Sequence, residues 1–131
     1  MTGDTLLWRQ IHPGFVQNGQ VTSQAFRPTP KDQDRLSVYD GDRITAEAAW
    51  EHYTETLHLL SHGVMAVSVA ECDAQALPVE ADGRSFPEHV SIIFAGLTIS
   101  ERERRAKRLR EAARARGWQY RATAWAGEGA S

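Results

Sequence analysis

The chain has 131 residues, of which 41% are hydrophobic and 24% charged, and its formal net charge is −2. This is the composition of an ordinary globular domain, large enough to bury a core without disulfides or metals. No apolar run approaches the roughly 18 residues of a membrane span, and one cysteine, Cys72, cannot form an internal disulfide.

The first ten residues lack the basic and apolar regions of a secretory signal. Together with the single cysteine, this favours a cytoplasmic, reducing location. We therefore expect no membrane association. Cys72 follows an apolar run, which indicates a buried residue rather than a nucleophile or metal ligand.

Hydrophobic periodicity predicts the elements in chain order. Strands are expected over residues 5–11, 64–71, 77–80, 89–95 and 118–123, with short extended pieces near 21–26 and 36–39. One helix is expected over 46–60, capped by Thr45 and ended at Gly63. A second helix begins near Thr98 or Ser100, each giving a capping box, and runs to Arg116.

These elements predict a small single α+β domain over residues 1–123, followed by a flexible tail over 124–131. We expect one mixed or mainly antiparallel sheet with two helices on one face. The stripe predicted to face the sheet from the second helix consists of Ile99, Ala106, Leu109 and Ala113.

A long polar segment, Trp8 to Asp42, is the most informative part of the chain. A loop of this length inside a domain is uncommon unless it binds something or is disordered, and its scattered aromatic and aliphatic residues argue against disorder. Arginine and lysine bind phosphates and carboxylates through charge-assisted hydrogen bonds, so a small anionic ligand is expected there. The expected ligand-binding residues are Arg9, His12, Ser23, Arg27, Lys31 and Tyr39. The alternative is a solvated loop whose aromatic residues pin it to the core.

Catalytic motifs are weak. Ser23 and Ser37 lie in the polar segment, but no nucleophile elbow and no Ser/His/Asp spacing singles them out. His12 and His89 both lie at strand ends beside loops and could meet, although such histidines commonly anchor loops. No metal-binding spacing occurs, so neither a metal nor a cofactor is expected.

An arginine in the first strand, Arg9, is followed by a loop with an SQAF element, then LSVYD, then a helix of the A-x-x-A type. This order, which covers less than half of the chain, resembles that of RES-type and other ADP-ribosyltransferase-like, NAD-consuming toxins. The resemblance implies that Arg9 helps to hold NAD and that Ser37 with Tyr39 lines the nicotinamide pocket. It further implies that Glu71 or Glu51 contributes to catalysis.

A strong charge asymmetry lies in the second helix. Residues 101–116 hold eight of the fifteen Lys and Arg but only three of the seventeen Asp and Glu. This face is read either as solvated and internally paired, or as a surface for an acidic protein partner or a second copy, through Arg104, Arg105 and Arg108. Nucleic-acid binding through residues 101–116 is less expected, because the isoelectric point is about 6.2.

The leading hypothesis is a ligand- or partner-binding module, such as an accessory or antitoxin-like component of a bacterial multi-protein system. The competing hypothesis is an enzyme, with Arg9, His12, Ser37, Tyr39 and Glu71 as candidate catalytic residues. An enzyme requires these side chains to converge in one concave pocket, whereas a binding module needs only an exposed patch.

Overall fold

The computed structural model describes residues 1–122, so the tail expected over 124–131 lies outside the described residues. The strands are β1 (Leu6–Ile11), β2 (Val16–Gln17), β3 (Gln20–Val21), β4 (Arg35–Asp40), β5 (Gly63–Ser68), β6 (Val79–Glu80), β7 (His89–Ile93) and β8 (Tyr120–Arg121). The helices are α1 (Ala46–Glu51), α2 (Val69–Ala74) and α3 (Ile99–Arg116), with a π-helical turn η4 (His52–Thr56) directly after α1. Three 3-10 turns, η1 (Pro13–Phe15), η2 (Ser23–Phe26) and η3 (Pro30–Asp32), lie between β1 and β4.

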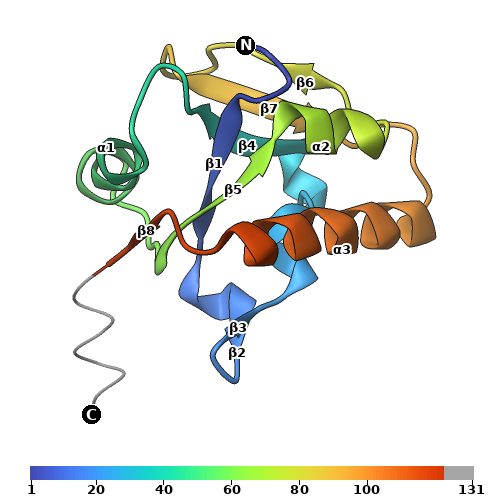
Figure 1. The fold of residues 1–131 in the computed structure, drawn as a ribbon, viewed down its shortest axis with the longest axis horizontal. Helices are drawn as coiled ribbons and strands as arrows, with labels where there is room; N and C mark the ends of the chain where they lie inside the picture. Colours follow the sequence, from blue (N-terminus) through green and yellow to red (C-terminus); the bar gives the residue numbers. More distant parts are fainter. Residues whose placement is uncertain (123–131) are drawn as a thin grey trace.

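Six strands form one sheet in the order β6-β7-β4-β1-β5-β8, while β2 and β3 form a separate hairpin. Every strand pair of this sheet within residues 1–122 is antiparallel. The predicted α+β class and mainly antiparallel sheet are therefore confirmed (Figure 1).

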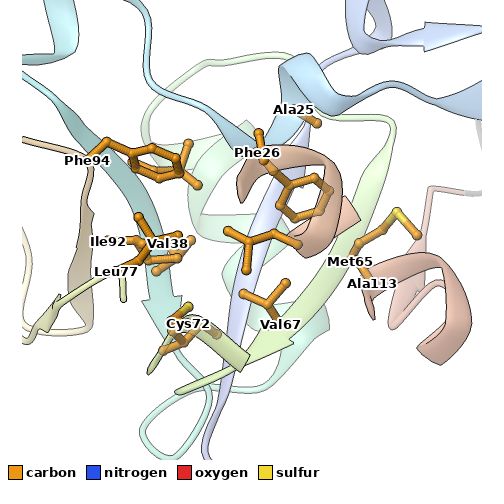
Figure 2. Close-up of a cluster of buried hydrophobic side chains, with 14 of the residues drawn as sticks. Ala25, Phe26, Val38, Met65, Val67, Cys72, Leu77, Ile92, Phe94 and Ala113 are labelled. Atoms are coloured by element: carbon orange, nitrogen blue, oxygen red, sulfur yellow. The ribbon is translucent and has the colours of Figure 1, made fainter. Parts of the chain in front are cut away.

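Hydrophobic side chains pack on both faces of the sheet. On one face, Leu7 and its neighbours pack with α2, α3 and η2 around the fully buried Phe26 (Figure 2). On the other face, Trp8 packs with Ala49 of α1. The expectation that both long helices lie on one face is therefore wrong. The reason is β5, which is buried at every position and so needs cover on both sides.

The helix predicted over 46–60 is only partly helical. Thr45 caps it as expected, but α1 ends at Glu51 and continues as the π-helical turn η4. The chain then leaves the helix at His58, which adopts a left-handed conformation with φ of +57°. Gly63 opens β5 rather than ending the helix. A Cβ atom there would lie 2.6 Å from the carbonyl oxygen of Tyr120, so the close approach of β8 requires glycine.

The polar segment is not one loop, which corrects the prediction of a long N-terminal loop. It contains the β2–β3 hairpin, three 3-10 turns and the whole of β4, a central strand of the sheet. Within β4, Leu36 and Val38 are buried in the core, while Ser37 between them is exposed. This period of two fits a strand. It agrees with the extended piece expected near 36–39, which the structure lengthens to Arg35–Asp40.

Each of the five predicted strands extends beyond the observed one. The strand predicted over 64–71 ends at Ser68, because Ser68 caps α2 and its side chain accepts a hydrogen bond from the backbone of Glu71. The carboxylate of Glu71 in turn accepts one from the backbone of Ser68, which completes a capping box. The strand expected over 118–123 begins later, since β8 covers Tyr120–Arg121, and residue 123 lies outside the described residues.

The second helix agrees with its prediction. It covers Ile99–Arg116, and Ala106, Leu109 and Ala113 of the predicted stripe are buried. Ile99 is an exception, because 77% of it is exposed. None of the helices in the described chain combines the length and apolar character that crossing a bilayer requires.

The first testable prediction separates the two possible caps of α3. Thr98 accepts a hydrogen bond from the backbone of Glu101, and the Glu101 carboxylate accepts one from the backbone of Thr98. Thr98→Ala should therefore lower the free energy of unfolding by about 1 kcal/mol, measured by urea denaturation. Ser100→Ala, inside the helix, is the matched control and should have little effect. Equal losses in the two variants would contradict this capping geometry.

Candidate functional site

A gap between two neighbouring strands forms the base of the site. β1 pairs with β5 along its whole length, from Leu6↔Ser68 to Ile11↔Gly63. Its pairing with β4 is limited to Leu7↔Asp40 and Trp8↔Tyr39. Beyond Trp8 the two strands diverge, and side chains rather than backbone bonds fill the space between them.

Gly41 fixes the closed end of this gap. Its backbone N–H donates to the carbonyl of Leu6 at 2.8 Å, and any side chain at this position would collide with that carbonyl oxygen. The Asp40-Gly41 turn therefore holds β1 and β4 together at one end only.

Arg9 bridges the open end of the gap. Its Nε donates to the carbonyl of Ala25 in η2 at 2.6 Å, and its NH1 donates to the carbonyl of Ser37 in β4 at 3.0 Å. Burial lowers the pKa of Arg9, while the nearby Tyr53 and Asp32 raise it, and an arginine stays protonated in proteins. Within residues 1–122, no carboxylate forms an ion pair with this guanidinium.

A pocket of about 500 Å³ opens above Arg9, a volume within the usual range for small-molecule sites. Its polar lining comes from Arg9, Gln10, His12, Lys31, Asp32, Ser37, Tyr39, Tyr53 and His89, and its apolar lining includes Phe15, Leu57 and Phe86. Of the lining residues in the described chain, Arg9 and Lys31 are cationic and Asp32 alone is acidic. The pocket is thus positive, although the sequence outside 101–116 is acidic overall.

The π-helical turn contributes one wall of the pocket. Such turns are rare in proteins, and those that occur are often found at functional sites. Here η4 brings Tyr53 into the pocket and places His52 beside Tyr39. Burial, with Tyr53 and Glu88 nearby, raises the pKa of Tyr39, so its hydroxyl stays protonated; it forms a hydrogen bond of 2.8 Å with Nδ1 of His52. Phe86 stacks on Tyr39, with ring centroids 4.9 Å apart.

A second polar chain runs through Ser37, His89 and Asp82. The Nδ1 of His89 lies 2.6 Å from Oδ1 of Asp82, and its Nε2 lies 3.1 Å from Oγ of Ser37. Ser37 pairs with Ser91 across β4 and β7, which makes Ser37 and His89 diagonal neighbours on the same face of the sheet. The serine is exposed, whereas His89 is buried.

Asp82 is held as a carboxylate. Burial by itself raises its pKa, but hydrogen bonds from Ser91 and His89 outweigh that effect and keep the pKa below its ordinary value of 3.8. A carboxylate beside Nδ1 favours the tautomer that carries its proton on that nitrogen, and in this tautomer Nε2 can accept a hydrogen bond from the Ser37 hydroxyl.

His12 and Lys31 lie at the mouth of the pocket. The Nδ1 of His12 accepts a hydrogen bond from the backbone of Gly14 at 2.8 Å, so the ring caps η1 while it lines the pocket. Lys31 is exposed and makes neither a hydrogen bond nor an ion pair within the described chain.

Other predicted site residues lie elsewhere. Ser23 begins η2 outside the pocket, and Arg27 pairs with Glu103 of α3 at 3.3 Å. Glu71 lies in α2, which covers the opposite face of the sheet, where it pairs with Arg116 at 2.9 Å. Glu51 is an exposed residue at the end of α1 and does not line the pocket.

The three arginines predicted to bind a partner differ in their surroundings. Arg105 is partly buried and donates to the carbonyl of Gln75 at 2.9 Å. Arg104 and Arg108 are exposed and make no ion pair within residues 1–122.

The sequence analysis does not single out His52, Tyr53 or Asp82. It considers His89 only as a possible neighbour of His12, and both histidines line the pocket. Asp82 lies in a loop that looks unremarkable, and only the β4–β7 register brings it near Ser37. Among the described residues, no group of three His, Cys, Asp or Glu side chains could hold a metal ion.

Comparison of the chain with protein-family models, curated proteins and solved structures gives no match. The geometry of the pocket is therefore the basis for inferring what the protein does.

The second testable prediction concerns the pH dependence of stability. Because the pKa of Asp82 is depressed in the folded state, its stabilisation is present above pH 3.8 and is lost as the pH falls through the lower native pKa. Asp82→Asn should therefore flatten the acid side of a profile of unfolding free energy against pH. Asp73→Asn, at an exposed position on α2, serves as the control. A profile unchanged by Asp82→Asn would contradict the assigned hydrogen bonds.

Proposed function

We propose that the protein binds a small anionic molecule, of the size of a mononucleotide, in the pocket above Arg9. The observation that carries this proposal is the Arg9 guanidinium itself, which is fixed by two backbone carbonyls and is without a carboxylate partner in the described chain. Arginine has five N–H donors. Two of them donate to the carbonyls of Ala25 and Ser37, which leaves three for the oxygens of a phosphate or carboxylate.

A second donor supports the same proposal. Gln10 lines the pocket and is only 4% exposed, yet its Nε2 has no hydrogen-bond partner in the described part of the chain. A buried donor without an acceptor is costly, so a bound anion that accepts a hydrogen bond from this Nε2 stabilises the pocket. The aromatic side chains of Phe15, Tyr53 and Phe86 suit a flat ring attached to that anion.

The third testable prediction concerns anion binding, measured by isothermal titration calorimetry with pyrophosphate and AMP. Arg9→Met should weaken binding about 10- to 100-fold, because it removes charge-assisted hydrogen bonds from a partly buried cation. Lys31→Ala should cause a smaller loss, because its charge is exposed.

Arg27→Met is the matched control, since Arg27 belongs to the same polar segment but lies outside the pocket and pairs with Glu103. Its affinity should equal that of the unaltered protein. Loss of binding in Arg27→Met with retention in Lys31→Ala would overturn the assignment. Because Arg9→Met removes bonds between strands, its melting temperature must be compared with that of the unaltered protein.

The resemblance to NAD-consuming toxins receives support from only some of its residues. Arg9, Ser37 and Tyr39 share the pocket, but the glutamates suggested for catalysis, Glu71 and Glu51, do not. We therefore favour binding of the anionic part of such a ligand over cleavage of its glycosidic bond. Release of nicotinamide from NAD that stops in Arg9→Met would favour the enzyme of that type instead.

The exposed face of α3 supports a second candidate function, that of an accessory component that docks an acidic partner. Arg104, Lys107, Arg108 and Arg114 are exposed residues of α3 that make no ion pair within the described residues. Lys107 and Arg108 follow Arg104 by three and four residues, and Arg114 follows Lys107 by seven, so these cations lie on one side of the helix. Such a face suits an acidic protein surface better than nucleic acid, since the rest of the chain is acidic. The cytoplasm is the compartment we propose for either activity, because the one cysteine is buried and unpaired.

The fourth testable prediction concerns this face. The double variant Arg104→Glu/Arg108→Glu should weaken binding of a polyglutamate peptide, more so at low salt than at high salt, as measured by fluorescence anisotropy. Pyrophosphate binding in the pocket should be unchanged. Stronger binding of duplex DNA than of the peptide would favour the nucleic-acid alternative.

A further inference from the structure

The chain through Ser37, His89 and Asp82 has the connections of a nucleophile, a base and an orienting carboxylate. Ser37 presents an exposed Oγ in the pocket, and Nε2 of His89 lies 3.1 Å from it. Asp82, whose side chain is 7% exposed, holds the other ring nitrogen at 2.6 Å. This arrangement is recognised by geometry and roles rather than by the order of the residues in the chain.

Neighbouring groups hold the carboxylate in place. Ser91 donates to Oδ2 of Asp82 at 2.6 Å, while Arg35 and Arg84 lie 3.4 and 3.5 Å from the same oxygen. The loop that carries Asp82 is tied back by a hydrogen bond from the backbone of Gly83 to the carbonyl of His89. The imidazole is therefore oriented by a fixed carboxylate, as a general base must be.

We propose that Ser37 is a catalytic nucleophile, with His89 as its general base and Asp82 as a positioning residue, and that it hydrolyses carboxylic esters that carry an anionic group. The preference for an anionic substrate rests on the proposed function, since Arg9 and Lys31 would hold that group. The reactivity of Ser37 does not depend on it.

The reaction requires only water as co-reactant. Oγ of Ser37 attacks the carbonyl carbon of the ester while its proton passes to Nε2 of His89. The tetrahedral adduct collapses with cleavage of the bond between carbon and the alcohol oxygen, and the alcohol leaves with the proton from His89. Water then loses a proton to the same nitrogen and attacks the acyl-serine. The bond between the carbonyl carbon and Oγ breaks, the carboxylic acid leaves, and the proton on His89 returns to Oγ, which restores Ser37 and His89.

A fluorophosphonate probe tests this assignment on the full chain, because it phosphonylates activated serines without the natural substrate. Intact-mass analysis and peptide mapping should find one adduct, on Ser37, that is absent from Ser37→Ala. His89→Gln and Asp82→Asn should slow labelling by about 100-fold or more. Ser85→Ala is the control, since Ser85 is an exposed serine at the edge of the same pocket without a histidine partner.

Three results would overturn the proposal: no adduct, an adduct that persists in Ser37→Ala, or labelling that is indifferent to His89→Gln. The outcome also separates this inference from the proposed function. If Ser37 is labelled but pyrophosphate does not bind, the anionic substrate is contradicted and the nucleophile is supported. If pyrophosphate binds but Ser37 is not labelled, the proposed function is supported, and Ser37, His89 and Asp82 are only a structural network.

A thiol version of the site gives a second measurement. The native Cys72 should not react with a thiol reagent at neutral pH, because it is buried and its pKa is raised to about 12. Ser37→Cys should react with iodoacetamide at neutral pH about 10-fold faster than Ser85→Cys, because a neighbouring base favours the thiolate. The double variant Ser37→Cys/His89→Gln should react as slowly as Ser85→Cys, which would support the role of His89 as the base. Equal rates for the two single variants would contradict it.

Discussion

The Arg9 guanidinium between β1 and β4 is the interaction on which the site depends. Two antiparallel strands normally satisfy each other's backbone groups, but here the ladder stops after Trp8. Arg9 replaces the missing bonds by donating to Ala25 and Ser37, and so joins β1, β4 and η2 at one point. The same side chain thereby stabilises an opened sheet and carries a positive charge into the pocket that the opening creates.

The two faces of the sheet divide structural and chemical roles. The face covered by α2 and α3 holds the larger apolar core (Figure 2). Glu71 and Arg116 form an ion pair between these two helices. The opposite face is covered by α1 and the π-helical turn η4, which together are shorter than α3 alone. There Ser37 of β4 is exposed in the pocket, beside the buried His89 of β7.

Local signals predicted much of the fold. The cap at Thr98 and the alternation in β7 are encoded by adjacent residues, so α3 and β7 were expected near their observed bounds. β4 was harder, since Leu36 and Val38 stand among charged residues. The Ser37–His89–Asp82 chain could not be predicted, because it depends on the register between β4 and β7 and on the fold of one loop. Arg9 was selected from residue type, but its role between strands follows only from their divergence.

The central claim is that Arg9 is fixed by two carbonyls and presents its remaining donors to an anion. Nuclear magnetic resonance of the Arg9 Nε–H group, during a titration with pyrophosphate, tests it most directly. We expect slow hydrogen exchange of this group in the free protein, because Nε donates a hydrogen bond to the carbonyl of Ala25 at 2.6 Å. We also expect the side-chain resonances of Arg9 and Lys31 to shift during the titration. Fast exchange of the Arg9 Nε–H, or shifts confined to Arg27 and the α3 arginines, would contradict it.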